Sequence, residues 1–240
     1  MLNDWFQDIN CEMSWATFQK LPRHPAFRYE YLSGRCRVTP RPQYYHARLP
    51  LESWEPISKD IVEREAVVVK PLSEVTCDDL HDSFIQAFAR TVPFHQLSEA
   101  ERQRAAAELI ERTFSGSDGP FHRDSSHVLR DRHSRDILGA SLITLLPSED
   151  LEHFDHPGWR TSPPTDAAET DWGFPHLTWI FVASSRQRRG LSSCLLDATV
   201  SALKDRGDKT LLSTFLLGHD QSLLWHWKMG FQLMSHVSSA

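Results

Sequence analysis

The sequence predicts an α/β protein with a small β-rich extension at its N-terminus. From residue 66 onward, apolar runs rich in β-branched residues alternate with segments whose apolar residues recur at helical spacing, in the order β-α-α-β-β-β-α-β-α-β. Before residue 60, short strand patterns and prolines dominate instead. We therefore divide the 240 residues into an extension at 1–60 and a larger α/β domain at 61–240.

The composition is that of an ordinary globular protein without a broad basic surface. Hydrophobic residues make up 40% of the chain, enough for a sizeable core. A net charge of -6 argues against a nucleic-acid partner or an anionic membrane, because either needs a basic face. No apolar run approaches the roughly 20 residues that span a bilayer, and residues 1–5 do not begin a signal peptide. We expect a cytoplasmic monomer or homodimer.

The cysteines and histidines give no metal-binding pattern. The four cysteines, Cys11, Cys36, Cys77 and Cys194, lie far apart and form no CxxC pair. This spacing favours reduced thiols over a disulfide framework or a structural zinc site. The thirteen histidines do not form HExxH or a comparable ligand spacing, so we expect no metal. A serine hydrolase is disfavoured too, since no GxSxG elbow follows a strand.

The extension is predicted to contain a short helix at 10–19 and two strands, at 27–32 and 35–38, around a Ser-Gly turn. Prolines follow, and residues 44–49 form one further extended piece. We assign this piece to the extension as well. The pattern does not indicate a function for the extension.

The first half of the larger domain begins with a buried strand at 66–70 that ends at a proline. A helix at 76–90 carries acids in its first turn, and a capping box at Ser98–Glu101 opens a second helix through about residue 114. Residues 126–130 and 137–146 then form a hairpin. The segment 147–175 is rich in prolines and acids, and predicts an irregular insertion.

The second half runs from a strand at 177–182 through a helix at 190–206, which Gly207 caps. A strand at 209–217, a helix at 221–229 and a last strand at 231–234 complete the chain.

The loop between the strand at 177–182 and the helix at 190–206 is the strongest candidate binding site. It consists of Gln187-Arg188-Arg189-Gly190-Leu191-Ser192. A glycine loop that opens a helix presents backbone N–H groups and the positive end of the helix dipole to an anion, and two arginines add charge. The loop therefore predicts a site for a phosphorylated ligand. A solvated helix start is the alternative.

In this context, between a strand and an amphipathic helix, the loop resembles the signature of the GNAT superfamily of acyl-CoA-dependent N-acetyltransferases. That signature has Gln or Arg, two variable residues, Gly, one variable residue, and then Gly or Ala. Gln187 and Gly190 fit, while Ser192 replaces the small last residue. The resemblance covers about residues 66–235.

A second match lies near the C-terminus, where GNAT proteins often have an aromatic residue four positions before a Gly-Phe pair. Gly230 and Phe231 form that pair here. His226 stands at the position where the family commonly has a tyrosine, and His219 stands where an asparagine is frequent.

The resemblance implies a mixed, mostly antiparallel central sheet that is splayed after its fourth strand, near Val182, with helices on both faces. Acetyl-CoA, as co-substrate, would enter the split, and an amine would attack its thioester directly. The residues implied in binding are Ile180, Phe181 and Val182 along the pantetheine, Gln187, Arg188, Arg189, Gly190, Leu191, Ser192 and Ser193 around the pyrophosphate, and His219.

For catalysis we propose His226 as the general acid that protonates the departing thiolate, because an imidazolium near its ordinary pKa of about 6.5 can donate a proton. The alternative is a packed helical residue between two tryptophans. No motif places the general base, for which Asp118, Asp171 and His176 are candidates. A non-catalytic acyl-CoA sensor or scaffold with the same shell is the alternative function, and the acceptor amine is not indicated.

Overall fold

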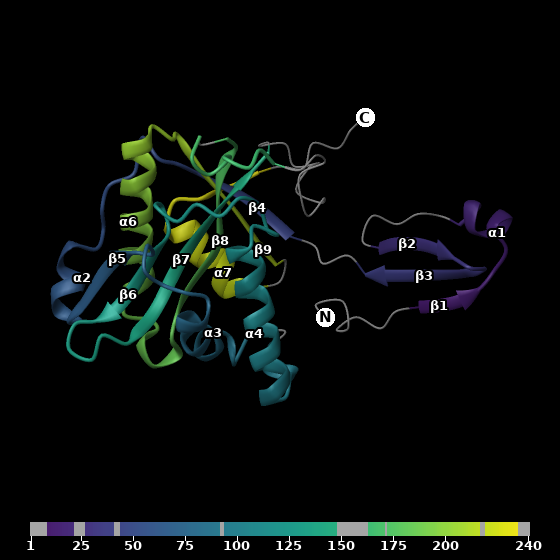
Figure 1. Ribbon diagram of the computed structural model, residues 1–240, viewed down its shortest axis with the longest axis horizontal. Helices are drawn as coiled ribbons and strands as arrows, with labels where there is room; N and C mark the ends of the chain where they lie inside the picture. The colour runs from purple at the N-terminus through teal and green to yellow at the C-terminus, as the bar shows by residue number, and fades with distance from the viewer. Residues whose placement is uncertain are drawn as a thin grey trace.

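The computed structural model describes residues 9–21, 27–40, 44–91, 94–147, 163–170, 172–216 and 219–234. They form a seven-stranded mixed sheet with helices on both faces and a separate three-stranded sheet (Figure 1). The smaller sheet and its helix consist of β1 (Ile9–Glu12), α1 (Trp15–Gln19), β2 (Phe27–Leu32) and β3 (Arg35–Pro40). The first half of the larger unit consists of β4 (Tyr44–Pro50), α2 (Lys59–Arg64), β5 (Val67–Pro71), α3 (His81–Phe88), α4 (Glu99–Phe114), β6 (His127–Asp131) and β7 (Ile137–Leu146). The second half consists of β8 (Phe174–Val182), α6 (Leu191–Arg206), β9 (Thr210–Leu216), α7 (Asp220–Lys228) and β10 (Gln232–Leu233).

The larger sheet has the strand order β10-β4-β9-β8-β7-β6-β5. Every neighbouring pair is antiparallel except β8 and β9, which are parallel. From β5 to β10 the elements follow one another in the order that the sequence predicts, which confirms an α/β chain with a mixed, mostly antiparallel sheet.

β4 corrects the predicted extent of the N-terminal extension. We assigned residues 44–49 to the extension, but β4 is an interior strand of the larger sheet, antiparallel to β9 over its whole length and paired with β10 on its other side. Ala47 and Leu49 belong to the apolar core that the larger sheet forms with α6. β-Propensity alone predicts a strand here without showing which sheet it joins. That β1–β3 forms a domain of its own remains a prediction.

Two other predictions need comment. The helix expected at 10–19 is shorter, because Ile9–Glu12 forms a strand and Ser14 caps α1 by accepting a hydrogen bond from the Thr17 amide. The capping box at the start of α4 is confirmed, with the Ser98 and Glu101 side chains each bonded to the other's backbone N–H. The insertion predicted at 147–175 lies mostly outside the described residues. Within it, residues 165–170 form turns, and β8 already begins at Phe174.

The two faces of the sheet have different helices and separate apolar cores. On one face α3 and α4 pack against Leu142 and Phe181, and Phe84 lies at the centre of this core. On the other face α6 and α7 pack against residues that alternate with these along the strands, such as Ile143 and Val182. Figure 1 shows α6 on the opposite side of the sheet from α3 and α4. The sheet is therefore covered on both faces, as expected.

Candidate functional site

The strands β8 and β9 separate after a short contact. Their parallel register covers only two pairs, His176 with Leu212 and Leu177 with Ser213. β8 continues along β7 to Val182. Leu177 is paired with Ile143 and Trp179 with Leu142, so Thr178 between them is the extra residue of a β-bulge. In the described part of the chain, no strand pairs with the β9 side of β8 beyond Leu177. This edge offers backbone N–H and C=O groups to an extended ligand.

The loop at 187–190 follows directly from this open edge, and Gln187 fixes it. The Gln187 side-chain amide donates to the carbonyl of Val182 at 3.0 Å and to that of Ala87 at 3.2 Å. The loop is thereby tied to the end of β8 and to the end of α3. The Gln187 side chain, which the resemblance implies in pyrophosphate binding, thus donates its hydrogen bonds to backbone carbonyls of the protein.

Gly190 is the N-cap of α6 and has a φ of 81°. This backbone conformation favours glycine, and a Cβ there would also lie 2.7 Å from Cδ1 of Ile61, so that the end of the Ile61 side chain would have to move. Arg188 also adopts a positive φ, of 63°. The turn begins a 16-residue helix, whose first amides can bind an anion, and the Gln187–Val182 hydrogen bond ties the loop before it to the end of β8.

The arginines of the loop are partly neutralised by acids from distant segments. Arg186 pairs with Asp131 at 2.7 Å, and Arg189 pairs with Glu65 at 3.0 Å. The hydrogen bond from Arg189 holds the pKa of the Glu65 carboxyl below its ordinary value. Arg188 is exposed and forms no ion pair with a described residue. Its guanidinium is the positive group of the loop best placed to meet an anion.

Ser192, the departure from the signature, is contacted by α7. The indole Nε1–H of Trp225 donates to Ser192 Oγ at 2.9 Å. A hydroxyl that accepts one hydrogen bond still has its own proton to donate. The neighbouring Ser193 hydroxyl donates to the Gly190 carbonyl instead. Ser192 therefore adds a donor to the first turn of α6, and the same contact joins the first turn of α6 to α7.

His226 does not have the properties expected of a general acid. Its side chain is 4% exposed and stacks on the ring of Phe215 with a centroid distance of 4.0 Å. Nε2 lies 2.8 Å from Ser213 Oγ and Nδ1 lies 2.7 Å from the Ser222 carbonyl. Burial lowers the pKa of His226 to about 4. The assumption of an ordinary pKa was wrong, and at neutral pH this imidazole carries no proton to spare.

The other residues that the resemblance implies in acetyl-CoA binding differ in exposure. Phe181 and Val182 are buried on opposite faces of β8, so only their backbone is available to a ligand, and Ile180 is half-buried. Leu191 and Ser193 are buried in the first turn of α6. His219 is the N-cap of α7 and half-buried, and burial lowers its pKa.

A series of partly buried hydrogen bonds crosses the sheet at the point where β8 and β9 part. Thr214 Oγ1 lies 3.1 Å from His176 Nε2, and His176 Nδ1 lies 3.1 Å from Thr178 Oγ1. Thr178 Oγ1 lies 2.7 Å from Thr144 Oγ1, which donates to the Asp118 carbonyl at 3.2 Å. The sequence did not reveal this series, because its members come from four separate segments.

This series links His176 with Asp118, two of the three candidates for the general base, but Asp118 takes part through its backbone carbonyl and not through its carboxylate. His176 is buried, and burial lowers its pKa to about 3, so its imidazole is neutral. The Asp118 carboxylate accepts from Arg112 at 2.9 Å and from the Thr113 hydroxyl at 2.9 Å. Both lie on the α4 face, opposite α6. Asp171 lies outside the described residues.

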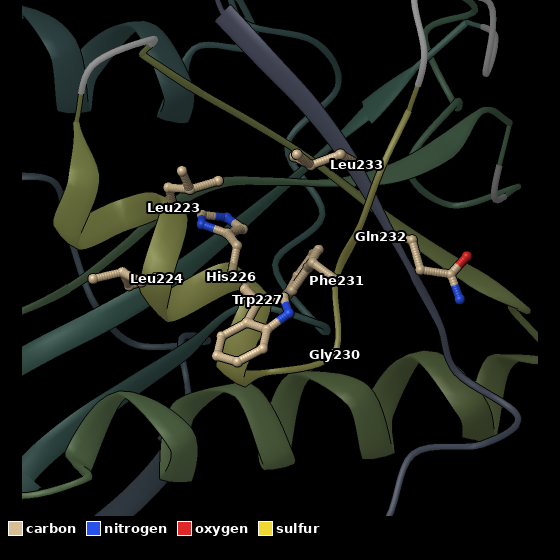
Figure 2. Close-up of a pocket in the computed structure, with 8 residues that line it drawn as sticks. All are labelled: Leu223, Leu224, His226, Trp227, Gly230, Phe231, Gln232 and Leu233. Carbon is tan, nitrogen blue, oxygen red and sulfur yellow. The ribbon is translucent and has the colours of Figure 1, made fainter.

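One hollow lies over α7, and His226 is among the residues that line it. It has a volume of about 650 Å³ and is lined by α7 and the segment that leads into β10 (Figure 2). Its wall is largely apolar, with Leu224 61% and Trp227 75% exposed. None of the loop residues or of β8 lines it. Among the described residues, no group of His, Cys, Asp and Glu side chains could hold a metal ion.

Three features agree with the architecture implied by the sequence resemblance. They are the element order, the separation of β8 from β9, and the glycine loop that begins α6. The chain has a GNAT-like fold. None of the helices in the described part of the chain combines the length and the apolar composition needed to cross a bilayer.

No family model matches the sequence, and no curated protein matches it either. The chain is similar to the structure of a GCN5-related N-acetyltransferase from Sphaerobacter thermophilus, with 12% identity and a TM-score of 0.49 over 81% of this chain and 50% of that one. It thus spans about half the length of that protein. It is also similar to PH1933 from Pyrococcus horikoshii OT3, with 13% identity and a TM-score of 0.49 over 70% and 90%.

A third similar structure is a GNAT family acetyltransferase from Elizabethkingia anophelis with acetyl-CoA bound. The identity is 15% and the TM-score 0.43, over 71% of this chain and 79% of that one. The fold assignment rests on the element order and the split sheet.

Proposed function

We propose that the protein is an N-acetyltransferase that moves an acetyl group from acetyl-CoA to a primary amine. The observation that carries the proposal is the open edge of β8, which leads directly to the amides at the N-terminus of α6. An extended arm that ends in a pyrophosphate fits this sequence of groups, because the strand edge can pair with amides and the helix start can bind phosphate. Acetyl-CoA is such a ligand.

In this proposal the backbone of Ile180–Val182 pairs with the pantetheine. The first-turn amides of α6, the Ser192 hydroxyl and Arg188 hold the pyrophosphate. The polar groups of the α4 face lie across the sheet from α6, so the acceptor amine would approach from that face. Asp118 and His176 are the residues there that could orient it.

The chemical step is a direct transfer. The amine nitrogen attacks the thioester carbonyl, the C–S bond breaks, and the sulfur leaves as the thiolate of coenzyme A. One proton must leave the nitrogen, and the thiolate takes one up. A thiol has an ordinary pKa of about 8.5, so its thiolate is a competent leaving group without a strong acid beside it. We therefore assign no protein acid, since His226 is neutral and buried.

The proposal is tested by calorimetric titration with acetyl-CoA and by an acetyl-transfer assay over a panel of small amines, antibiotics, peptides and lysine side chains. The Arg188→Glu/Arg189→Glu variant should bind acetyl-CoA at least about tenfold more weakly, because two positive groups near the phosphates become negative. The Arg104→Glu/Lys204→Glu variant makes the same charge change far from the loop and should bind as the wild type does. Equal affinities in all three proteins would refute the phosphate site.

The transfer assay decides between the proposed enzyme and the alternative function. Acetyl-CoA binding with transfer to at least one amine supports an N-acetyltransferase. Binding without transfer to any acceptor would instead favour a non-catalytic sensor or scaffold that keeps the same shell.

A further inference from the structure

The register of the smaller sheet brings two of the four cysteines together. Cys11 in β1 is the direct antiparallel partner of Cys36 in β3. Directly opposed residues of an antiparallel pair place their side chains on the same face of the sheet. On the other side of β3, Tyr31 of β2 is the partner of Cys36. Cys11, Cys36 and Tyr31 therefore form one row across the three strands.

The backbone geometry of the pair is compatible with a disulfide. The Met13 amide donates to the Gly34 carbonyl at 3.0 Å, which makes these two residues a hydrogen-bonded position of the ladder. Such positions alternate along an antiparallel pair, so Cys11 and Cys36 occupy one too. The Cα atoms there are about 5.5 Å apart, inside the range of about 4.4–6.8 Å that disulfides span.

The surroundings favour a bond that forms and breaks. Cys36 is fully buried and Cys11 is partly exposed, so a small disulfide in solution meets Cys11 first. At a hydrogen-bonded position the Cβ atoms lie about 5 Å apart and must approach to about 3.8 Å for the bond. This requires the two strands to pinch together, and strain of this kind makes a disulfide easier to reduce.

We propose that Cys11 and Cys36 form a reversible disulfide with glutathione disulfide as the oxidant. The Cys11 thiolate attacks one sulfur of glutathione disulfide and releases one glutathione thiolate. Cys36 then loses its proton, its thiolate attacks the Cys11 sulfur, and the second glutathione thiolate leaves. Two protein thiols are oxidised, and one glutathione disulfide is reduced to two glutathione thiols.

The bond would secure a unit with a very small core. Among the described side chains of 9–40, Phe18 and Cys36 are the buried ones. Rings of Trp15, Phe18 and Tyr31 pack beside one another at centroid distances of 5.1 to 5.4 Å. Small units with few buried residues depend strongly on cross-links. The disulfide would close the chain between Cys11 and Cys36 into a loop and hold the four-residue strand β1 on the sheet.

The test is oxidation of the full-length protein over a series of ratios of reduced to oxidised glutathione, followed by alkylation of remaining thiols, trypsin digestion and mass spectrometry. Lys20 and Arg35 lie between the two cysteines, so trypsin separates them unless they are bonded. We expect a linked peptide that contains Cys11 and Cys36, formed at least about tenfold faster in the native protein than in urea, because folding holds the thiols together.

Variants make the assignment specific. Cys77→Ser should leave the linked peptide unchanged, whereas Cys36→Ala should abolish it and leave Cys11 bonded to glutathione. In the oxidised wild type, thermolysin cleavage within 9–40 should slow by about tenfold, and dithiothreitol should restore the original rate. If Cys11 of the wild type keeps glutathione at every ratio, bonds to another cysteine, or links no faster than in urea, the proposal is wrong. None of these outcomes bears on acetyl transfer.

Discussion

Lowering the pH from about 8 to about 5 should reduce the free energy of unfolding through His226. At the lower pH this histidine is protonated in the unfolded chain and stays neutral in the folded protein. In the folded protein the imidazole is enclosed by Phe215 and Phe231 and accepts or donates hydrogen bonds at both ring nitrogens. Its pKa of about 4 lies below the ordinary value near 6.5 that it regains on unfolding. Stability should therefore fall as the pH drops through about 6.5, and the loss should level off below about pH 4.

The magnitude follows from the difference between the two pKa values. Protonating His226 costs ~3 kcal/mol more in the folded protein than in the unfolded chain, since the pKa difference of about 2.5 counts about 1.4 kcal/mol for each unit. At about pH 5 most of the unfolded chains already hold the proton, so ~2 kcal/mol of the free energy of unfolding is lost through this residue. His176, with a pKa of about 3, contributes a similar loss at that pH.

The assay is urea unfolding of the wild type and of His226→Gln at about pH 8 and about pH 5. Glutamine has hydrogen-bonding groups but does not titrate, so the loss of stability on acidification should be ~2 kcal/mol smaller in the variant. Gln103→Ala, at an exposed position of α4 without a titrating side chain, serves as the control and should lose as much as the wild type. An equal loss in all three proteins, or an NMR titration of His226 with a midpoint near 6.5, would refute the buried neutral imidazole and restore His226 as a possible acid.

Two further predictions concern the loop. Ser192→Ala and Trp225→Phe should each weaken acetyl-CoA binding by roughly three- to tenfold in calorimetry. The two effects should not add in the double variant, because each change removes the same Trp225–Ser192 hydrogen bond. Additive effects would show that the two residues do not act through this bond. Gly190→Ala should destabilise the protein by about 1–3 kcal/mol in urea unfolding through its positive φ and the Ile61 contact. Adding Ile61→Val should recover part of that loss, and no loss in the single variant would contradict the strained turn.

The long periodic segments of the fold could be predicted from the sequence, and the contacts between distant segments could not. α4 and α6 have regular apolar positions and identifiable ends, so their placement follows from local physics. β4 carries an equally clear strand pattern, yet nothing within it shows that β9 is its partner. The strand was predictable and its sheet was not.

The candidate site divides in the same way. The glycine at 190 and the loop around it follow a local pattern, so the sequence places them correctly. The acids that neutralise Arg186 and Arg189 come from β6 and from the turn after α2, and no local pattern connects them with the loop. His226 was assigned by its position relative to Gly230, which does not show that Ser213 and Phe215 enclose it. Tertiary packing set its pKa, and tertiary packing is what a single sequence leaves open.

β4 also has a consequence for the order in which the molecule can be assembled. Tyr44 pairs with Leu216, and Arg48 pairs with Gln232, so an early segment is completed by the two last strands of the described chain. During synthesis β4 leaves the ribosome long before either neighbour exists. Until β9 and β10 have been synthesised, the backbone N–H and C=O groups of β4 stay unpaired or form non-native pairs. Contacts this far apart along the chain make closure of the sheet a slow, late event in folding. The half of the sheet that borders the split is thus the half that forms last.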